Sequence, residues 1–254
     1  MNSPISPEPN EFSVVLPCYN EVENIITLIE EIIRHMGEPG VLVSAYEILV
    51  VDDCSTDETA HAVKQRFSAD HPRVRTLVHL QNYGQSAAIC TGVAAATHPW
   101  IVVLDGDGQN DPADIPALLQ RLKTVYREHR KPMICGQRVK RRDTWVRKLS
   151  SKVANKVRAG LLHDDTPDTG CGLKVFSKAA YLRFPHFNHM HRFLPALAQR
   201  DGGYVESVAV NHRPRQHGVS KYGLNNRLWV GLVDLCGVMW LQRRKFRGFD
   251  HEEQ

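Results

Sequence analysis

Residues 101–109 read IVVLDGDGQ, an apolar strand that ends on two carboxylates, Asp105 and Asp107, and on the amide of Gln109. Oxygen ligands at this spacing suit Mg²⁺ or Mn²⁺ that bridges to the phosphates of a substrate. A second acidic strand end, ILVVDDCSTD at 48–57, lies upstream. We expect both strand ends at one edge of a sheet, which is where ligands bind in open α/β proteins.

Apolar strands and helical patterns alternate through the first two-thirds of the chain. The patterns predict strands at 12–17, 47–52, 74–79 and up to Asp105, with helices at 22–36, from Ser55 onward and at 85–96. Asn20 is expected to cap the first helix in a capping box with Glu23, and Ser55 to open the second helix with Glu58 three residues on. Repeated β-α units of this length predict a doubly wound, mostly parallel α/β sheet with right-handed crossovers.

Length and composition fit one globular domain rather than a disordered or fibrous chain. The 254 residues are 42% hydrophobic and 24% charged, enough for a sizeable core. Six scattered cysteines without a Cys-x-x-Cys pair argue against a disulfide framework or a zinc site and favour a reducing compartment. Residues 1–11 lack the apolar segment of a signal peptide, so we expect a flexible N-terminus, a domain at 12–226 and a cytoplasmic protein.

Positive charge is concentrated between Arg138 and Arg158, a segment that contains nine Lys or Arg residues and a single acidic residue, Asp143. Apolar residues recur there at helical spacing, with lysines on another face, which predicts a basic amphipathic helix. Such a segment is expected to meet an anionic partner. The alternative is the solvated face of a helix that packs on the core.

The motifs that carry chemistry exclude two common nucleotide sites. No Gly-x-Gly-x-x-Gly follows the first strand, and no Gly-x-x-x-x-Gly-Lys-Ser/Thr occurs, so a diphosphate held through a metal is the remaining option. The ordered motifs are Pro17-x-Tyr19-Asn20-Glu21, Asp52-Asp53-x-Ser55-x-Asp57, Asn82-x-Gly84, Asp105-x-Asp107-x-Gln109, Asp168-Thr169-Gly170-Cys171-Gly172 and Gly218-x-Ser220-Lys221-Tyr222. Together they resemble the inverting family 2 glycosyltransferases with the GT-A fold, in particular the dolichol-phosphate mannose synthase and undecaprenyl-phosphate sugar transferase branch.

The resemblance implies transfer, with inversion, from a nucleoside-diphosphate sugar (GDP-mannose or UDP-hexose) to a polyprenyl phosphate, with no nucleic-acid partner. It implies a nucleotide-binding set and a metal-binding set: Pro17, Tyr19, Glu21, Asp53 and Asp105 for the nucleotide, and Asp105, Asp107 and Gln109 for Mg²⁺ or Mn²⁺. A capping role is the alternative for Asp57. The family often has Ala and Leu where this chain has Gly106 and Gly108, which predicts a more flexible loop.

The resemblance also assigns the acceptor side. Arginine suits bidentate phosphate binding, so Arg138, Arg142 and Arg213 are the expected ligands of the acceptor phosphate, each with an ordinary surface cation as the alternative. Asp168 and Lys221 are the expected catalytic residues: Asp168 orients the acceptor or acts as base, and Lys221 offsets phosphate charge.

Two rival functions and one closer alternative predict different motifs or acceptors. A nucleotidyltransferase would show a Gly- and Lys/Arg-rich loop after the first strand, and a degenerate scaffold would have lost the metal carboxylates. The closer alternative is a family 2 transferase that adds sugar to a hydroxyl of a glycan or lipid. The histidines at 186, 189 and 191 are interpreted as pocket lining or core packing rather than as metal ligands.

The C-terminal segment 227–254 begins with an apolar run at 228–241 that is interrupted by Asp234 and bracketed by Trp229 and Trp240. It is shorter than the roughly 18–20 residues of a spanning helix, and basic residues follow it. This pattern predicts a helix that lies on the cytoplasmic face of an anionic membrane. Packing on the domain, or pairing of two protomers, is the alternative.

Overall fold

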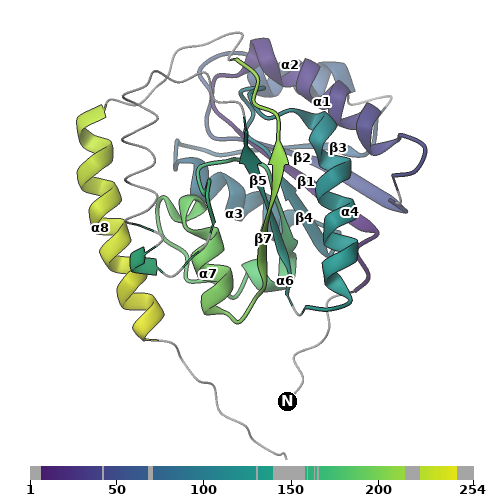
Figure 1. The fold of residues 1–254 in the computed structure, drawn as a ribbon. Coiled ribbons are helices and arrows are strands. Elements are labelled where there is room, and N and C mark those ends of the chain that lie inside the picture. The colour runs from purple at the N-terminus through teal and green to yellow at the C-terminus, as the bar shows by residue number, and fades with distance from the viewer. Residues whose placement is uncertain are drawn as a thin grey trace, which may run out of the picture.

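The structure is a computed structural model that describes residues 7–41, 43–67, 71–129, 131–139, 158, 160–162, 164, 166–214 and 224–244, with the backbone alone at 224–230. This part of the chain builds a seven-stranded sheet in the order β3-β2-β1-β4-β6-β5-β7 (Figure 1). The strands are β1 (Glu11–Cys18), β2 (Ala45–Asp52), β3 (Val74–Val78), β4 (Trp100–Val103), β5 (Met133–Arg138), β6 (Lys174–Ser177) and β7 (Val205–Val210). Only β6 among them runs antiparallel to its neighbours, so the mostly parallel sheet is confirmed.

Helices cover both faces of this sheet, as a doubly wound fold requires (Figure 1). One face carries α1 (Val22–Met36), α2 (Thr59–Phe67) and α4 (Ile115–Tyr126), and the other carries α3 (Gln85–Ala95), α6 (Lys178–Tyr181) and α7 (Leu194–Arg200). Two short 3₁₀ turns, η1 (Pro112–Asp114) and η2 (Met190–Arg192), precede α4 and α7 along the chain. Two apolar clusters fill the space between the sheet and these helices. Because side chains alternate along a strand, Val14 is buried in the cluster under α1, α2 and α4, and Val15 in the cluster under α3, α6 and α7.

The capping box expected at Asn20 and Glu23 is wrong. Asn20 has a φ of +55°, and α1 receives no side-chain cap from the residue before it. The Asn20 amide instead reaches across to Thr56, whose N–H donates to Asn20 Oδ1 at 2.7 Å. Left-handed backbone at Asn20 turns the side chain away from its own helix and toward the β2–α2 loop.

The predicted start of the second helix at Ser55 is also wrong, because α2 begins at Thr59. The Ser55 hydroxyl instead donates a hydrogen bond to Asp52 Oδ1. The carboxylate of Asp57 serves two helices instead: Oδ2 accepts the N–H of Val22 at 3.3 Å, and Oδ1 accepts the N–H of Thr59 at 3.0 Å. A single acidic side chain therefore satisfies the first N–H groups of both α1 and α2.

The last described helix, α8 (Leu224–Arg243), lies outside α7 (Figure 1). Leu235 and Val238 are buried in a small cluster with Leu162, Phe193 and Ala196. The opposite side exposes large apolar side chains, with 69% of Val233 and 59% of Trp240 accessible to solvent. Among the described helices, none is both long enough and apolar enough to cross a bilayer.

Candidate functional site

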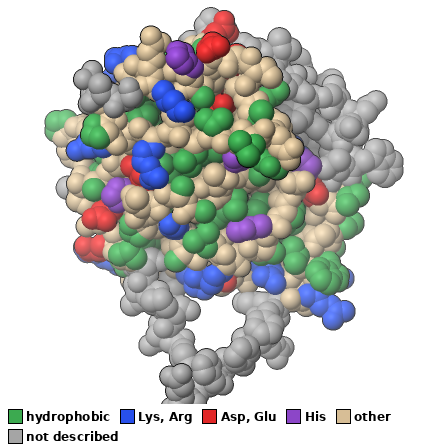
Figure 2. Space-filling view, turned by 180° about the vertical axis from the view of Figure 1, so that it is seen from behind, with side chains coloured by type: hydrophobic (Ala, Val, Ile, Leu, Met, Phe, Trp, Pro, Cys, Tyr) green, Lys and Arg blue, Asp and Glu red, His purple; other side chains and the backbone are tan. Residues whose placement is uncertain are grey.

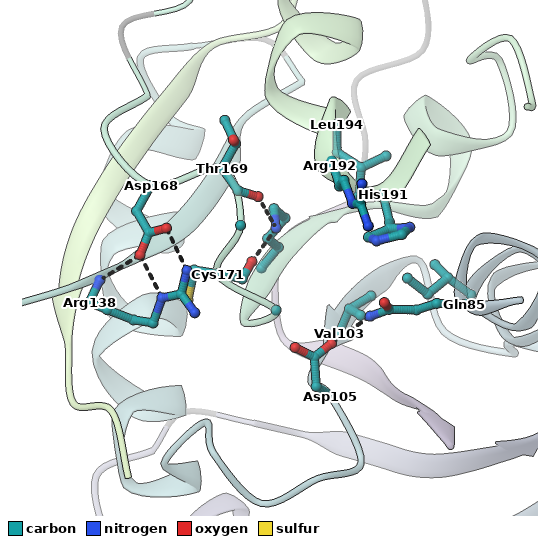
Figure 3. A pocket seen from close by; sticks show the side chains of 14 residues that line it. Gln85, Val103, Asp105, Arg138, Asp168, Thr169, Cys171, His191, Arg192 and Leu194 are labelled. Atoms are coloured by element: carbon teal, nitrogen blue, oxygen red, sulfur yellow. Dashed lines mark hydrogen bonds and ion pairs between the residues drawn. The ribbon is translucent and has the colours of Figure 1, made fainter. Parts of the chain in front are cut away.

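A cavity of about 360 Å³ opens at the edge of the sheet where β4 and β5 end (Figure 3). Its lining is mostly polar and mixes both signs of charge. It is formed by Gln85, Ile89, Val103, Asp105, Arg138, Asp168, Thr169, Gly170, Cys171, Gly172, Lys174, His191, Arg192 and Leu194. A cavity of this size and polarity suits a small polar ligand.

The Asp105 carboxylate lies in this cavity and is held in one orientation. Gln85 Nε2 donates to Oδ1 at 2.7 Å, and Asn110 Nδ2 lies 3.5 Å from Oδ2. A Cβ atom on Gly172 would lie 2.6 Å from Oδ1 and nearer still to Oδ2, so the carboxylate rests against bare backbone. Burial, and then the charge of Asp107, raise the pKa of Asp105 to about 6.

The two glycines of the Asp-Gly-Asp-Gly loop have steric reasons that the sequence did not show. Gly106 N–H donates to Pro17 O at 3.3 Å, and a Cβ on Gly106 would lie 2.9 Å from Cys18 Cβ. Gly108 has a φ of +70°, which side chains rarely adopt. Gly106 therefore lets this loop pack against the end of β1, and Gly108 lets it turn there. The expectation was only that these glycines make the loop more flexible.

The pair Asp105 and Asp107 fits a divalent cation. Their mutual repulsion raises the pKa of Asp105, and a bound cation would relieve it. Asp107 Oδ1 also accepts the N–H of Gln109 at 3.1 Å, which keeps Gln109 in the same turn. Among the described residues, at this pair as elsewhere, no group of three His, Cys or acidic side chains gathers as a metal site. The remaining ligands of a cation at this pair would come from a substrate and from water.

Arg138 and Asp168, predicted for separate roles, form one ion pair on the wall of the cavity (Figure 3). Arg138 Nε donates to Oδ2 and Nη2 to Oδ1, each at 2.7 Å, and the Arg138 N–H donates to Oδ2 at 3.2 Å. Side-chain exposure is only 15% and 9%. Arg142, Lys221 and most of the predicted basic helix lie outside the described residues.

Arg213 does not line the cavity. Its Nη1 contacts Glu31 and its Nη2 contacts Asp111, both at 2.6 Å. The Arg213 N–H donates to Gln109 O at 2.9 Å, so Arg213 links the turn that follows Asp105 and Asp107 to Glu31 in α1. Its role toward an acceptor phosphate stays a prediction.

The nucleotide set divides in the same way, because Asp105 lines the cavity whereas Pro17, Tyr19, Glu21 and Asp53 do not. Asp53 is buried, and its carboxylate accepts the N–H groups of Tyr83 at 2.9 Å and Gly84 at 2.7 Å. These bonds hold the loop that enters α3.

Sequence reasoning missed Lys174 and Ser86. It interpreted the histidine stretch, together with the residues that follow it from Arg192, as pocket lining or core packing, and His191 and Arg192 do line the cavity. Lys174 is 4% exposed, and its Nζ donates to the carbonyls of Thr169, at 3.2 Å, and Cys171. It therefore supports the loop that carries Asp168. A lysine directly before the apolar pair Val175 and Phe176 was the available signal.

The family model described as Glycosyl transferase family 2 matches residues 13–186. The dodecaprenyl-phosphate galacturonate synthase of Rhizobium johnstonii (strain DSM 114642 / LMG 32736 / 3841) is 32% identical over 243 residues, which cover 93% of this chain and 69% of that protein.

Two solved structures share the fold at low identity. Mannosyl-3-phosphoglycerate synthase from Rubrobacter xylanophilus aligns with a TM-score of 0.68 and 17% identity, over 95% of this chain and 77% of that one. Glucosyl-3-phosphoglycerate synthase from Mycobacterium tuberculosis, in complex with Mn²⁺, UDP-glucose and glycerol 3-phosphate, aligns with a TM-score of 0.65 and 18% identity, over 92% and 80%. These two likenesses show the fold.

Proposed function

Because the chain belongs to glycosyl transferase family 2, we propose that it moves a sugar from a nucleoside-diphosphate sugar to a polyprenyl phosphate, with inversion. The observation that carries the proposal is the cavity in which Asp105 and the Arg138–Asp168 pair meet. The 32% identical dodecaprenyl-phosphate galacturonate synthase supports a polyprenyl phosphate acceptor. Because that relative is named for galacturonate, a nucleotide-linked hexuronate joins GDP-mannose and UDP-hexose among the donors to be tested.

On the donor side, Asp105 and Asp107, with Gln109, would hold Mg²⁺ or Mn²⁺ against the diphosphate. The Mn²⁺ in the complex of glucosyl-3-phosphoglycerate synthase supports a divalent metal. Such an ion supplies positive charge that offsets the charge of the departing nucleoside diphosphate. Gln85 and Gly172 keep the Asp105 carboxylate at its place in the cavity.

On the acceptor side, Asp168 fixes the plane of the Arg138 guanidinium through two parallel hydrogen bonds. An oxygen of the acceptor phosphate attacks the anomeric carbon while the bond from that carbon to the diphosphate oxygen breaks. A phosphate monoester is largely dianionic at neutral pH, with a second pKa of about 6, so the attack needs cations rather than a base. Arg142 and Lys221 are proposed to add charge to this step.

The experiment that tests the function uses labelled sugar nucleotides with undecaprenyl phosphate and Mn²⁺ or Mg²⁺. UDP-galacturonic acid, UDP-glucose, UDP-galactose and GDP-mannose are supplied separately, and label is extracted into organic solvent. Label in the solvent phase only when the acceptor carries its phosphate supports the proposal. Equal transfer to undecaprenol, which has a hydroxyl and no phosphate, would instead establish the hydroxyl-acceptor alternative.

We further propose that α8 brings the enzyme to its lipid as a peripheral membrane protein. Leu235 and Val238 anchor the helix on the domain, while Leu232, Val233 and Trp240 are 51%, 69% and 59% exposed on its other side. Exposed Arg243 and Arg244 follow at the helix end, and Figure 2 shows apolar and basic side chains together along this margin of the molecule. Apolar and basic groups on one surface match an anionic membrane.

Sedimentation with anionic liposomes at low salt tests this surface. Val233→Glu with Trp240→Glu is expected to abolish sedimentation, because both side chains project away from the anchored side. Leu182→Glu, a comparably exposed leucine at the end of α6, is the matched control and should sediment normally. Unchanged binding by the double variant would refute the membrane role, and a change from dimer to monomer would assign the surface to protomer pairing.

A further inference from the structure

The wall of the cavity opposite the Arg138–Asp168 pair is built by α3 and η2 (Figure 3). Ser86, the second residue of α3, is buried, and its Oγ lies 2.8 Å from His191 Nδ1. The same Oγ accepts the backbone N–H of His191 at 3.3 Å. Among the described residues these are its hydrogen-bond partners, so the hydroxyl serves to hold the His191 ring.

The hydrogen bonds at Ser86 favour Nε2 as the place of the proton on that ring. The Ser86 hydroxyl already accepts from the His191 backbone, and its own proton needs an acceptor in a buried place, for which Nδ1 is within reach. Burial, followed by the charges of Arg192 and Lys174, lowers the pKa of His191 to about 3. The imidazole is therefore neutral at neutral pH, and with Nδ1 as acceptor it carries its proton on Nε2.

The position of the ring limits what it could bind. His191 lines the cavity together with Gln85, which holds the Asp105 carboxylate at 2.7 Å. The nucleoside candidates Pro17, Tyr19, Glu21 and Asp53 lie outside this cavity. If the diphosphate is held at Asp105, the part of the donor inside the cavity is its sugar. A neutral N–H donor suits a hydroxyl oxygen, whereas a phosphate favours a cationic partner.

We infer that His191 is a sugar-binding residue of the donor site, where its Nε2–H donates to a hydroxyl of the transferred sugar and Ser86 keeps the ring in that orientation. The inference rests on the proposed function in one respect: it assumes that a nucleotide sugar enters the cavity with its diphosphate at Asp105. It adds a specificity-determining residue on the wall facing Arg138.

The test measures sugar recognition apart from nucleotide recognition. Calorimetry with Mn²⁺ compares UDP with UDP-glucose, UDP-galactose and UDP-galacturonic acid, and GDP with GDP-mannose. The sugar nucleotide that wild type binds most tightly is taken forward together with its own nucleoside diphosphate. His191→Phe keeps an aromatic ring but removes the donor, so its affinity for that sugar nucleotide is expected to fall about tenfold while its affinity for the nucleoside diphosphate is unchanged. His191→Gln, whose amide N–H reaches a similar place, should recover most of the loss.

His186→Phe is the matched control, since His186 belongs to the same histidine segment but contacts Cys90 and does not line the cavity. In ¹⁵N NMR spectra of the free protein, His191 should show the neutral Nε2–H form, and Ser86→Ala should disturb that form. A proton on Nδ1, equal losses for the nucleoside diphosphate and the sugar nucleotide in His191→Phe, or no loss at all would each overturn the inference. Tight, His191-dependent binding without transfer to undecaprenyl phosphate would refute the proposed acceptor and leave His191 in place.

Discussion

Gly172→Ala is the sharpest perturbation of the proposed donor site. The added Cβ would lie 2.6 Å from Asp105 Oδ1 and nearer to Oδ2, whereas an ordinary contact is about 3.5 Å. The carboxylate must therefore move by about 1 Å, away from the bond that Gln85 donates at 2.7 Å. Misplacement on that scale costs about 100-fold in turnover, so transfer to undecaprenyl phosphate should fall by about that factor.

Gly92→Ala provides a control with a comparable clash at a distance from the site. Its Cβ would lie 3.1 Å from Val51 Cγ2 and nearer to Val15, inside the core. Overpacking of this kind costs about 1–3 kcal/mol of stability, so this variant should melt at a lower temperature yet retain near-normal turnover per folded molecule. Activity in Gly172→Ala within about threefold of Gly92→Ala, both corrected for the folded fraction by thermal melting, would refute the positioning argument.

Three further outcomes are expected. Asp107→Ala, and excess EDTA on the wild type, should each remove at least about 100-fold of turnover, since both would abolish charge stabilisation at the diphosphate; full activity in EDTA would contradict a metal role. Arg138→Ala should raise the KM for undecaprenyl phosphate while calorimetric affinity for UDP survives, and the reverse pattern would place Arg138 on the donor side. Burial raises the pKa of Glu47, but hydrogen bonds from Thr97, Ser13 and Arg75 outweigh it and lower the pKa to about 2. The ionised carboxylate therefore stabilises the folded state above the ordinary pKa of about 4.5, and this contribution to stability is lost as the pH falls toward 2. Glu47→Gln should thus lower Tm at pH 7 and flatten its decline in acid, and parallel pH curves for the two proteins would count against this.

The fold was predictable because its signals are local and repeated. Apolar runs such as Val14 to Leu16 supply both faces of the sheet in alternation, and each is followed by a helical pattern. The acidic strand end at Asp105 and Asp107 also follows from the sequence, since strand direction alone decides which edge receives it.

The helix caps and the pairings in the site were less predictable, because they depend on contacts between distant segments. Asn20 and Ser55 both look like N-caps by type, yet the capping carboxylate is that of Asp57, which also serves a helix that begins 35 residues earlier. Arg138 and Asp168 each read as independent functional residues until their mutual bonds are seen. Nothing local announced that Ser86 and His191, separated by 105 positions, share a hydrogen bond.

The reversed direction of β6 has a consequence for how such an enzyme could diversify. β5 ends at Arg138 and β6 begins at Lys174, and these strands are neighbours, with Gly136 N–H donating to Leu173 O at 2.9 Å. A segment whose two ends are already adjacent can change length or sequence at little cost in closure entropy. The segment that we assign to the acceptor can therefore vary between relatives more easily than the strands that flank it. Gly172 is the exception, because its bare backbone leaves room for the Asp105 carboxylate of the donor site, and we expect an exchanged segment to work only where it keeps a glycine at that place.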